Sequence, residues 1–210
     1  MTASRPLPIT VETTESTEPR KALEPSSLKS PPAGLQAGRF VAIMATAMTM
    51  TACVAHVMEL PAKMRYEPSL YVMLHRTLYP NFGRIAGPAE GLAVASTAAL
   101  AWWCRIRRPR AFPLTAAAAG CLAAAHVIFW SVVNPVNIEM IKWPLDEIPP
   151  DWTTARDRWE YGHAVRAVLV TGALATLVAS ILAENHAITA APNARSARSA
   201  PGASDATPAR

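Results

Sequence analysis

The residues best suited to chemistry are histidines and glutamates that lie in or beside long apolar stretches. Glu160, His163 and Arg166 follow one another at intervals of three, so a helix places all three near one face. An ionisable side chain at membrane depth is costly unless it is paired or lines a cavity, so we expect this face to point into the protein. His56 and Glu59, also three apart, share a face near the end of an earlier apolar stretch.

Two further ionisable residues lie inside apolar stretches, at matching depth. His126 comes two turns before the polar segment at Asn134, roughly 10 Å below the boundary at a rise of about 1.5 Å per residue. Glu90, counted from the other direction, reaches a similar depth, where a lone carboxylate is unfavourable by several kcal/mol. Six residues from four stretches therefore share one level, and this coincidence is the strongest functional signal in the sequence: His56, Glu59, Glu90, His126, Glu160 and His163.

These six residues are predicted metal ligands in one interpretation, because carboxylates and Glu-x-x-His pairs build metal sites in helical bundles. Glu160-x-x-His163 has that order, whereas His56-x-x-Glu59 is reversed. Imidazole with carboxylate suits iron, copper or zinc, and the expected cofactor is either none or iron or copper. Two alternatives remain: a polar pocket for an organic substrate, with histidine as general base, and a structural hydrogen-bonding network.

The elements that position these residues are four apolar blocks. The chain has 210 residues, of which 51% are hydrophobic and 17% charged. The blocks cover 39–60, 86–104, 111–133 and 164–183, the last with a polar start from 162, and each approaches the roughly 20 residues that cross a bilayer. A soluble bundle would show a polar stripe on each helix, yet 92–103 and 114–125 are apolar nearly all round. The predicted fold is all-α, an integral membrane four-helix bundle spanning 39–185.

The segments outside the spans are also informative. Residues 1–38 and 186–210 are rich in Pro, Ser, Ala and charged residues and are predicted to be disordered tails. Pro61 is expected to stop or bend the first helix. Between 61 and 85, apolar residues recur at helical spacing and predict a short amphipathic helix that caps the outer face. Tyr66, Tyr71 and Tyr79 are explained there as interfacial anchors.

Charge predicts orientation rather than nucleic-acid binding. The net charge is +5, but the basic residues are not interleaved with aromatic residues. Arginines fill the turn at 105–110 and basic residues precede the first span, so the positive-inside rule places both segments and both termini in the cytoplasm, in a bacterial inner membrane. The basic connection at 61–85 opposes this orientation, and the acidic connection at 134–159 favours it.

Other common classes find no support in the sequence. Cys53, Cys104 and Cys121 all fall within predicted spans and are interpreted as small apolar residues rather than a disulfide framework. The apolar core of the first span begins too late for a cleavable signal peptide, so we expect this span to be retained. Walker, Rossmann, zinc-finger and Gly-x-Ser-x-Gly patterns are missing, which argues against nucleotide-dependent enzymes and hydrolases of those types.

A longer motif follows the third span. Asn134-Pro-Val-Asn137 is followed by Trp143, by Pro150-Asp-Trp152 and by Arg156-Asp-Arg-Trp-Glu-Tyr-Gly-His-Ala-Val-Arg166. With the four spans, this set resembles the family of small membrane proteins that includes the fungal anthrone oxygenases, over about 40–184. The resemblance implies oxidation of an electron-rich polycyclic or phenolic substrate by dioxygen.

In this hypothesis the partners are a small hydrophobic aromatic substrate and the lipid bilayer. An anthrone-type carbon beside a carbonyl loses a proton to a base, and the resulting anion reacts with dioxygen without a dedicated cofactor. The candidate catalytic residues are His126 or His163 as base, with Arg166 and Asn137 stabilising the oxyanion. The candidate substrate-binding residues are Asn134, Trp143, Trp159 and Glu90. The alternative is a non-enzymatic accessory, carrier or scaffold protein.

Overall fold

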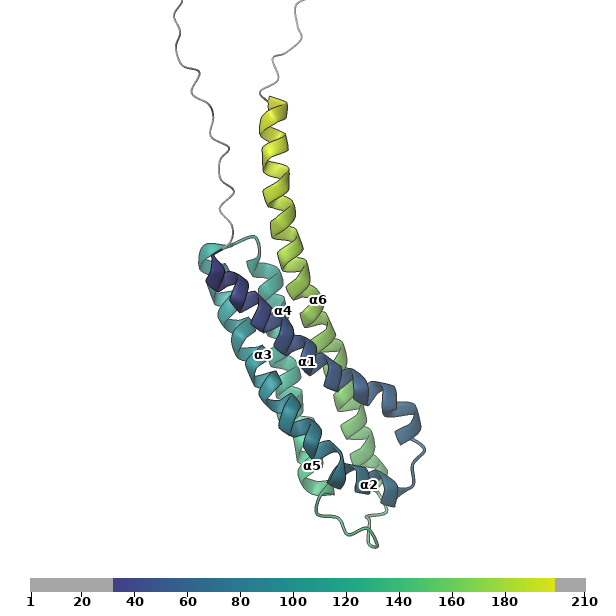
Figure 1. Ribbon diagram of the computed structural model, residues 1–210. Coiled ribbons are helices and arrows are strands. Elements are labelled where there is room, and N and C mark those ends of the chain that lie inside the picture. The colour runs from purple at the N-terminus through teal and green to yellow at the C-terminus, as the bar shows by residue number, and fades with distance from the viewer. Residues whose placement is uncertain (1–31, 199–210) are drawn as a thin grey trace, which may run out of the picture. The chain divides into compact units, whose positions relative to one another are not determined.

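The described part of the chain is entirely helical. The computed structural model describes the backbone of residues 32–198 and the side chains of residues 32–185, and no strand occurs in that range. Figure 1 shows the elements in order. They are α1 (Ala33–Lys63), α2 (Pro68–Thr77), α3 (Tyr79–Arg107), α4 (Phe112–Ile128), the π-helix η1 (Phe129–Val133), α5 (Asn134–Met140) and α6 (Trp152–Arg198). The all-α prediction is confirmed.

Three helical segments are long and apolar enough to cross a membrane. They are Ala33–Lys63, the continuous helix Phe112–Met140, and Trp152–Asn185. The fourth expected span lies in α3, which has 29 residues but combines Glu90 and Arg84 with many small residues, and it does not reach the same apolarity. Three helices among the described residues therefore support the prediction of an integral membrane protein.

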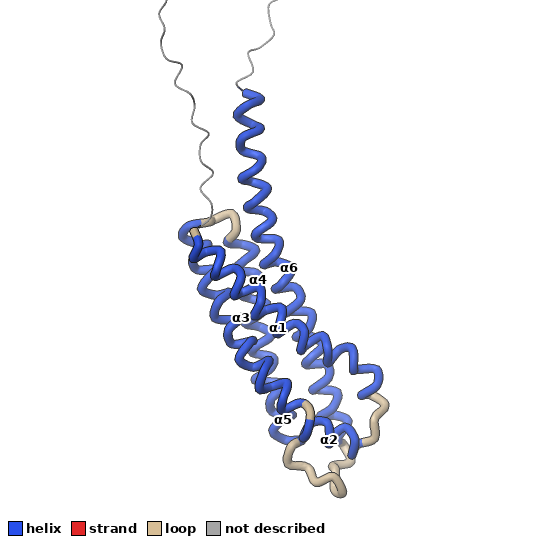
Figure 2. Tube along the Cα trace, viewed as in Figure 1, coloured by secondary structure: helices blue, strands red, loops and turns tan. Residues whose placement is uncertain are grey.

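The four long helices pack side by side, with their connections at the two ends (Figure 2). α1 packs against α3 and α6, and α4 packs against the same two helices, while α2 and α5 lie together at one end. Small side chains dominate the contact, including the buried residues Ala42, Ala93, Ala118, Ala167 and Ala173. Small residues let helix backbones approach closely, as between membrane helices generally.

Several helix ends differ from the predicted boundaries. α1 begins at Ala33 and α6 continues to Arg198, so helix covers 33–38 and 186–198, which were expected in the tails. Residues 1–31 and 199–210 lie outside the described residues. Pro61 does not end the first helix, which continues to Lys63. The short helix predicted between 61 and 85 is confirmed as α2.

The polar segment at Asn134 was expected to break the third span, but the helix continues to Met140 through one π-helical turn. Pro135 has no N–H for the carbonyl of Ser131, four residues earlier. Arg158 of α6 donates to that carbonyl over 3.4 Å. The wider turn and the arginine together let the helix pass the proline, and π-turns of this kind are frequent at functional sites.

Gly162 allows α6 to approach this π-helical turn. A Cβ atom at position 162 would lie 2.9 Å from Cγ2 of Val133 and 3.3 Å from Cγ1 of Val132. Both neighbours are branched side chains on the facing helix, so neither can move aside without shifting backbone. The glycine therefore sets the spacing between α6 and η1.

We predict that Gly162→Ala lowers the free energy of unfolding by about 1–3 kcal/mol, the usual effect of overpacking. Gly172→Ala is the matched control on the same helix, because nothing lies within 4 Å of a Cβ there and alanine is favoured over glycine in helices. Thermal unfolding in detergent measures both. Equal stability of the two variants would contradict the close-packing argument, whereas Gly162→Ala combined with Val133→Ala should recover part of the loss.

A buried ion pair joins the helices at the end opposite α2. Arg39 of α1 donates to Glu184 of α6, and both side chains are about nine-tenths buried. Arg108, in the turn after α3, lies 3.9 Å from the other carboxylate oxygen. Two arginines that served as topology markers in the sequence therefore also hold α1 and the α3–α4 turn against α6.

Glu184→Gln should destabilise the protein by about 3–5 kcal/mol, because it leaves a buried arginine without a counter-charge. Glu147→Gln, at an exposed position, is the control and should change stability by less than about 0.5 kcal/mol. Thermal unfolding of both variants in the same detergent provides the test. A neutral Glu184→Gln variant would mean that Arg39 finds water or another partner.

Candidate functional site

A cavity of about 400 Å³ lies between α1, α3, α6 and the η1–α5 segment, near α2. Its wall combines aromatic rings with polar side chains. Seven residues singled out from the sequence line it: His56, Glu90, Asn134, Asn137, Trp159, His163 and Arg166. The wall also contains His75, Tyr79, Phe82 and Phe129. Of the six residues predicted to share one depth, His56, Glu90 and His163 line this cavity, from α1, α3 and α6.

Arg166 and Glu90 form a buried ion pair at the centre of the helices. Nη2 of Arg166 donates to Oε2 of Glu90 over 2.6 Å, and both residues are more than nine-tenths buried. Nε of Arg166 donates to the carbonyl of Ala125 over 3.2 Å, and the guanidinium lies over the ring of Phe129. One arginine thereby joins α6 to α3, α4 and η1, and its charge is compensated.

The hydrogen bonds of His126 leave neither ring nitrogen free. Nε1 of Trp130 donates to Nε2 of His126 over 3.0 Å, so that nitrogen is the acceptor. The other nitrogen, Nδ1, then carries the proton and faces Oε1 of Glu90 at 3.3 Å. His126 does not line the cavity. Its contacts orient Glu90 and do not leave a lone pair for substrate, which opposes the predicted role of His126 as base.

His163 is oriented by Arg166, three residues further along α6. Nη1 of Arg166 lies 3.3 Å from Nδ1 of His163, and because arginine only donates, Nδ1 accepts. In the neutral ring the proton is therefore on Nε2. His163 lines the cavity, so the nitrogen it can offer to a ligand is a donor rather than the predicted base.

Trp159 is the aromatic centre of the site. Its Nε1 donates to Oδ1 of Asn137 over 2.6 Å, and its ring is 99% buried. Three imidazoles pack around the indole, with centroids 4.2 Å away for His163, 4.6 Å for His75 and 4.8 Å for His56. Tyr79 stacks on it at 5.1 Å. Because Oδ1 of Asn137 is occupied, its amide N–H groups are the part left for other partners.

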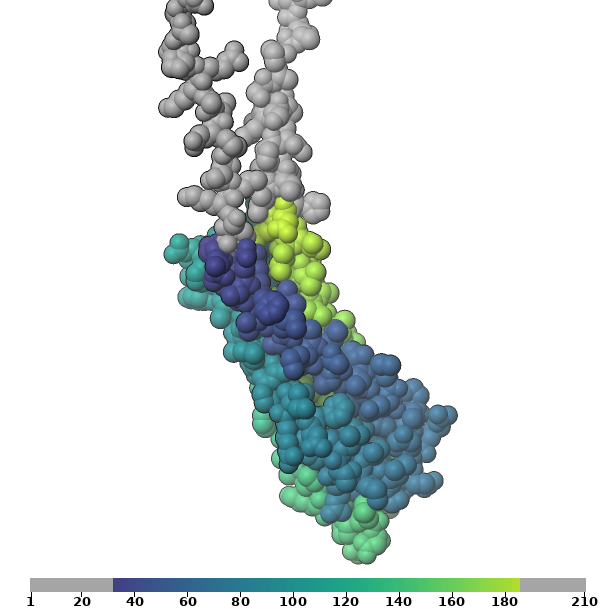
Figure 3. All heavy atoms as spheres, in the orientation of Figure 1, coloured from purple at the N-terminus to yellow at the C-terminus, as the bar shows by residue number. Residues whose placement is uncertain are grey.

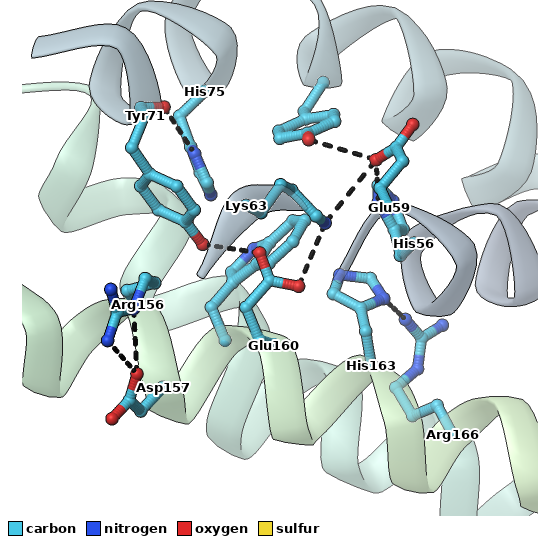
Figure 4. Close-up of polar contacts among 12 residues, drawn as sticks. His56, Glu59, Lys63, Tyr71, His75, Arg156, Asp157, Glu160, His163 and Arg166 are labelled. Carbon is cyan, nitrogen blue, oxygen red and sulfur yellow. Dashed lines mark hydrogen bonds and ion pairs between the residues drawn. The ribbon is translucent and has the colours of Figure 1, made fainter. Parts of the chain in front are cut away.

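A second polar network lies beside the cavity, where Figure 4 shows Lys63 pointing between two glutamates. Nζ of Lys63 lies 2.9 Å from Oε2 of Glu160 and 3.5 Å from Oε2 of Glu59. The hydroxyl of Tyr71 donates to Glu160 over 2.9 Å, and that of Tyr79 donates to Glu59 over 3.1 Å. Burial and the neighbouring Glu160 raise the pKa of Tyr71, so it remains a donor.

Among the described residues, His56 at Nδ1 and His75 at Nε2 each have a buried ring nitrogen without a hydrogen-bond partner. The Nδ1 of His75 lies 3.1 Å from the backbone carbonyl of Tyr71, which only accepts, so Nδ1 is protonated. Nε2 is buried and makes no hydrogen bond within the described residues. Burial lowers the pKa of His75 to about 4, with the charge of Lys63 adding to the effect and the bond to Tyr71 opposing it. His75 is therefore neutral at pH 7, with a lone pair on a residue that lines the cavity.

This pKa predicts acid sensitivity. The unfolded chain takes up a proton at His75 as the pH falls below about 6.5, whereas the folded protein does so only near pH 4. The folded state is therefore most stable, with respect to this residue, above pH 6.5. As the pH falls toward 4 its free energy of unfolding decreases, by about 2 kcal/mol at pH 5. Unfolding temperatures at pH 7.5 and pH 5 should therefore differ less in His75→Phe than in the wild type. An unchanged difference would show that His75 is already accessible to protons.

The predicted metal ligands do not gather as one centre. Among the described residues no three His, Cys, Asp or Glu side chains lie close enough together to hold a metal ion. The six predicted ligands are divided instead: Glu90 and His126 pair with each other, whereas Glu59 and Glu160 share Lys63. His56 lies 3.6 Å from Glu59, beyond hydrogen-bond distance. The arrangement does not fit the predicted iron or copper site, because basic side chains occupy the carboxylates.

Trp143, predicted to stack on substrate, does not line the cavity. It packs against the aromatic cluster around Tyr71 and Trp159, and its carbonyl accepts from Arg76.

Three site residues were missed by the sequence reasoning. Lys63 and Tyr71 were assigned to an outer loop and to the membrane interface, but they are 99% and 100% buried. His75 belongs to the amphipathic segment predicted between 61 and 85 and is not among the residues predicted for the site. A usable signal was present, since Tyr71 and His75 are four residues apart and fall on one face of α2. The residues on the inward face of α2 are polar, so a search for apolar residues at helical spacing does not find them.

No family model, curated protein or solved structure matches the chain. The resemblance to the anthrone-oxygenase family therefore stands on the motif from Asn134 to Arg166 and on the hydropathy pattern alone. Function has to be argued from the geometry of the cavity.

Proposed function

We propose that this protein is a four-span membrane oxygenase that oxidises a planar, electron-rich aromatic substrate with dioxygen, in the manner of the anthrone oxygenases. The observation that carries the proposal is a cavity with an aromatic wall, lined by His75, whose acceptor nitrogen Nε2 has no partner among the described residues. Small-molecule sites in proteins typically have volumes of about 300–1,000 Å³, and this cavity falls in that range. Stacking faces are supplied by Trp159, Tyr79 and Phe129.

The proposed fourth span is α3. Its central carboxylate, Glu90, is compensated by Arg166, so the pair carries no net charge into the membrane. The exposed side chains Ile85, Leu92, Trp102 and Ile106 would face lipid. The proposal places both termini in the cytoplasm on the basis of the arginines at 105–110.

The proposed reaction begins with proton transfer. The methylene carbon that lies across the central ring from the ketone of an anthrone passes a proton to Nε2 of His75, and the electron pair is delocalised through the flanking rings onto the ketone oxygen. Nε2–H of His163 and the amide of Asn137 stabilise that oxyanion. Dioxygen then adds to the carbon, and the peroxide loses water, so that R₂CH₂ and O₂ become R₂C=O and H₂O.

This assignment moves the base from His126 or His163 to His75. His126 donates to Glu90 and accepts from Trp130, and His163 accepts from Arg166. Arg166 is paired with Glu90, so its proposed role is to orient His163 rather than to contact the oxyanion. Asn134 and Asn137 keep their proposed places at the substrate.

We predict that His75→Phe reduces turnover of an anthrone by a hundredfold or more, as loss of a general base typically does. His126→Gln is the control, because glutamine can still donate to Glu90 and the residue does not line the cavity. Oxygen uptake and quinone absorbance are followed together on detergent-purified protein. Equal rates in His75→Phe and the wild type would contradict the assignment of His75 as the base.

A non-enzymatic scaffold is the alternative, and the buried ion pairs Lys63–Glu160 and Arg166–Glu90 favour it. A scaffold would show no oxygen uptake with any aryl ketone. A purely structural role would not explain why the buried Nε2 of His75 has no hydrogen-bond partner among the described residues.

A further inference from the structure

A second cavity opens beside the first, between α1 and α3. Its volume is about 540 Å³, and it is lined on α1 by Met48 and small residues and on α3 by Asn81, Phe82, Ile85 and two alanines. Met48 and Ile85 are 52% and 67% exposed, so the groove opens to the outside of the helices. Figure 3 shows the surface hollowed where α1 and α3 diverge toward α2.

The groove adjoins the polar cavity. Ala52 of α1 and Phe82 and Ala86 of α3 line both. Ala55 and Ala89 line the groove alone. α1 is one of the helices apolar enough to cross a membrane, so in a bilayer the groove would face hydrocarbon rather than water.

The two compartments differ in chemistry. The groove wall is apolar apart from Thr51 and Asn81, whereas the cavity holds an acceptor on His75 and a donor on His163. His75 is 95% buried, and its Nε2 has no partner among the described residues. A hydroxyl group of a ligand would donate a hydrogen bond to that nitrogen. A buried acceptor that lacks such a bond is unfavourable. The ligand that fits both compartments has a hydroxylated ring at one end and a hydrocarbon chain at the other.

We propose that the protein binds a phenolic lipid, with its hydroxylated ring in the cavity against Trp159 and its hydrocarbon tail in the groove between α1 and α3. For catalysis this inference rests on the proposed oxygenase function, but the binding itself does not. The tail would pass Phe82, which borders both compartments. The ring would arrive from the bilayer, where such compounds partition.

The test measures binding under argon, which prevents turnover. Wild-type protein in nanodiscs is titrated with methylhydroquinone, decylhydroquinone and decylbenzene, and quenching of tryptophan fluorescence is followed. Decylhydroquinone should bind at least tenfold more tightly than either of the others, because only it fills both compartments. Ala55→Phe, which fills the groove, should remove the advantage of the tail and leave methylhydroquinone unaffected.

Ala98→Phe is the control for adding bulk to an exposed alanine of α3 outside both cavities, and it should bind all three compounds like the wild type. Equal affinity for the tailed and tailless phenols, or an equal loss of the tail's advantage in Ala98→Phe, would overturn the proposal. Tight binding of decylbenzene would overturn it as well, since the groove would then be a general lipid site. Binding as predicted, followed by no oxygen uptake in air, would retain this inference and reject the oxygenase.

Discussion

The ion pair between Arg166 and Glu90 is the contact on which the site depends. It joins α6 to α3, while the same guanidinium reaches the carbonyl of Ala125 on α4 and Nδ1 of His163. Breaking a buried pair by removing one partner typically costs about 3–5 kcal/mol, because an uncompensated charge is left behind. The pair therefore fixes the helices around the cavity and sets the orientation of a cavity histidine at the same time. Gly162 has a supporting role, since only a residue without Cβ lets α6 lie this close to η1.

The charged side chains in and beside the cavity wall are paired with one another. Lys63 is shared between Glu160 and Glu59, and two tyrosine hydroxyls complete the coordination of the carboxylates. Apart from the paired Glu90 and Arg166, the polar and aromatic part of the wall consists of imidazoles, amides and aromatic rings. Such a wall suits an uncharged aromatic molecule that acquires charge only during reaction, because donors placed in advance around a developing oxyanion need not reorganise.

The sequence predicted much of this arrangement and failed where tertiary pairing overrides local pattern. The inward face of Glu160, His163 and Arg166 followed from spacing and from the cost of charge in a membrane, and all three are buried. The partners were not predictable in the same way. Lys63 comes two residues after Pro61, a position typical of a loop, yet α1 includes it and its side chain pairs with Glu160. The metal hypothesis failed for a related reason, since spacing places carboxylates near histidines but does not reveal that lysine and arginine occupy them.

The most direct test of the central claim is the origin of the oxygen in the product. An anthrone is turned over by the purified protein under ¹⁸O₂ in ordinary water, and the quinone is examined by mass spectrometry. The account predicts one ¹⁸O atom in each product molecule, with the second atom of dioxygen released as water. Product that carries oxygen only from water, or label that appears at the same rate without protein, would contradict an oxygenase and leave the cavity as a binding site.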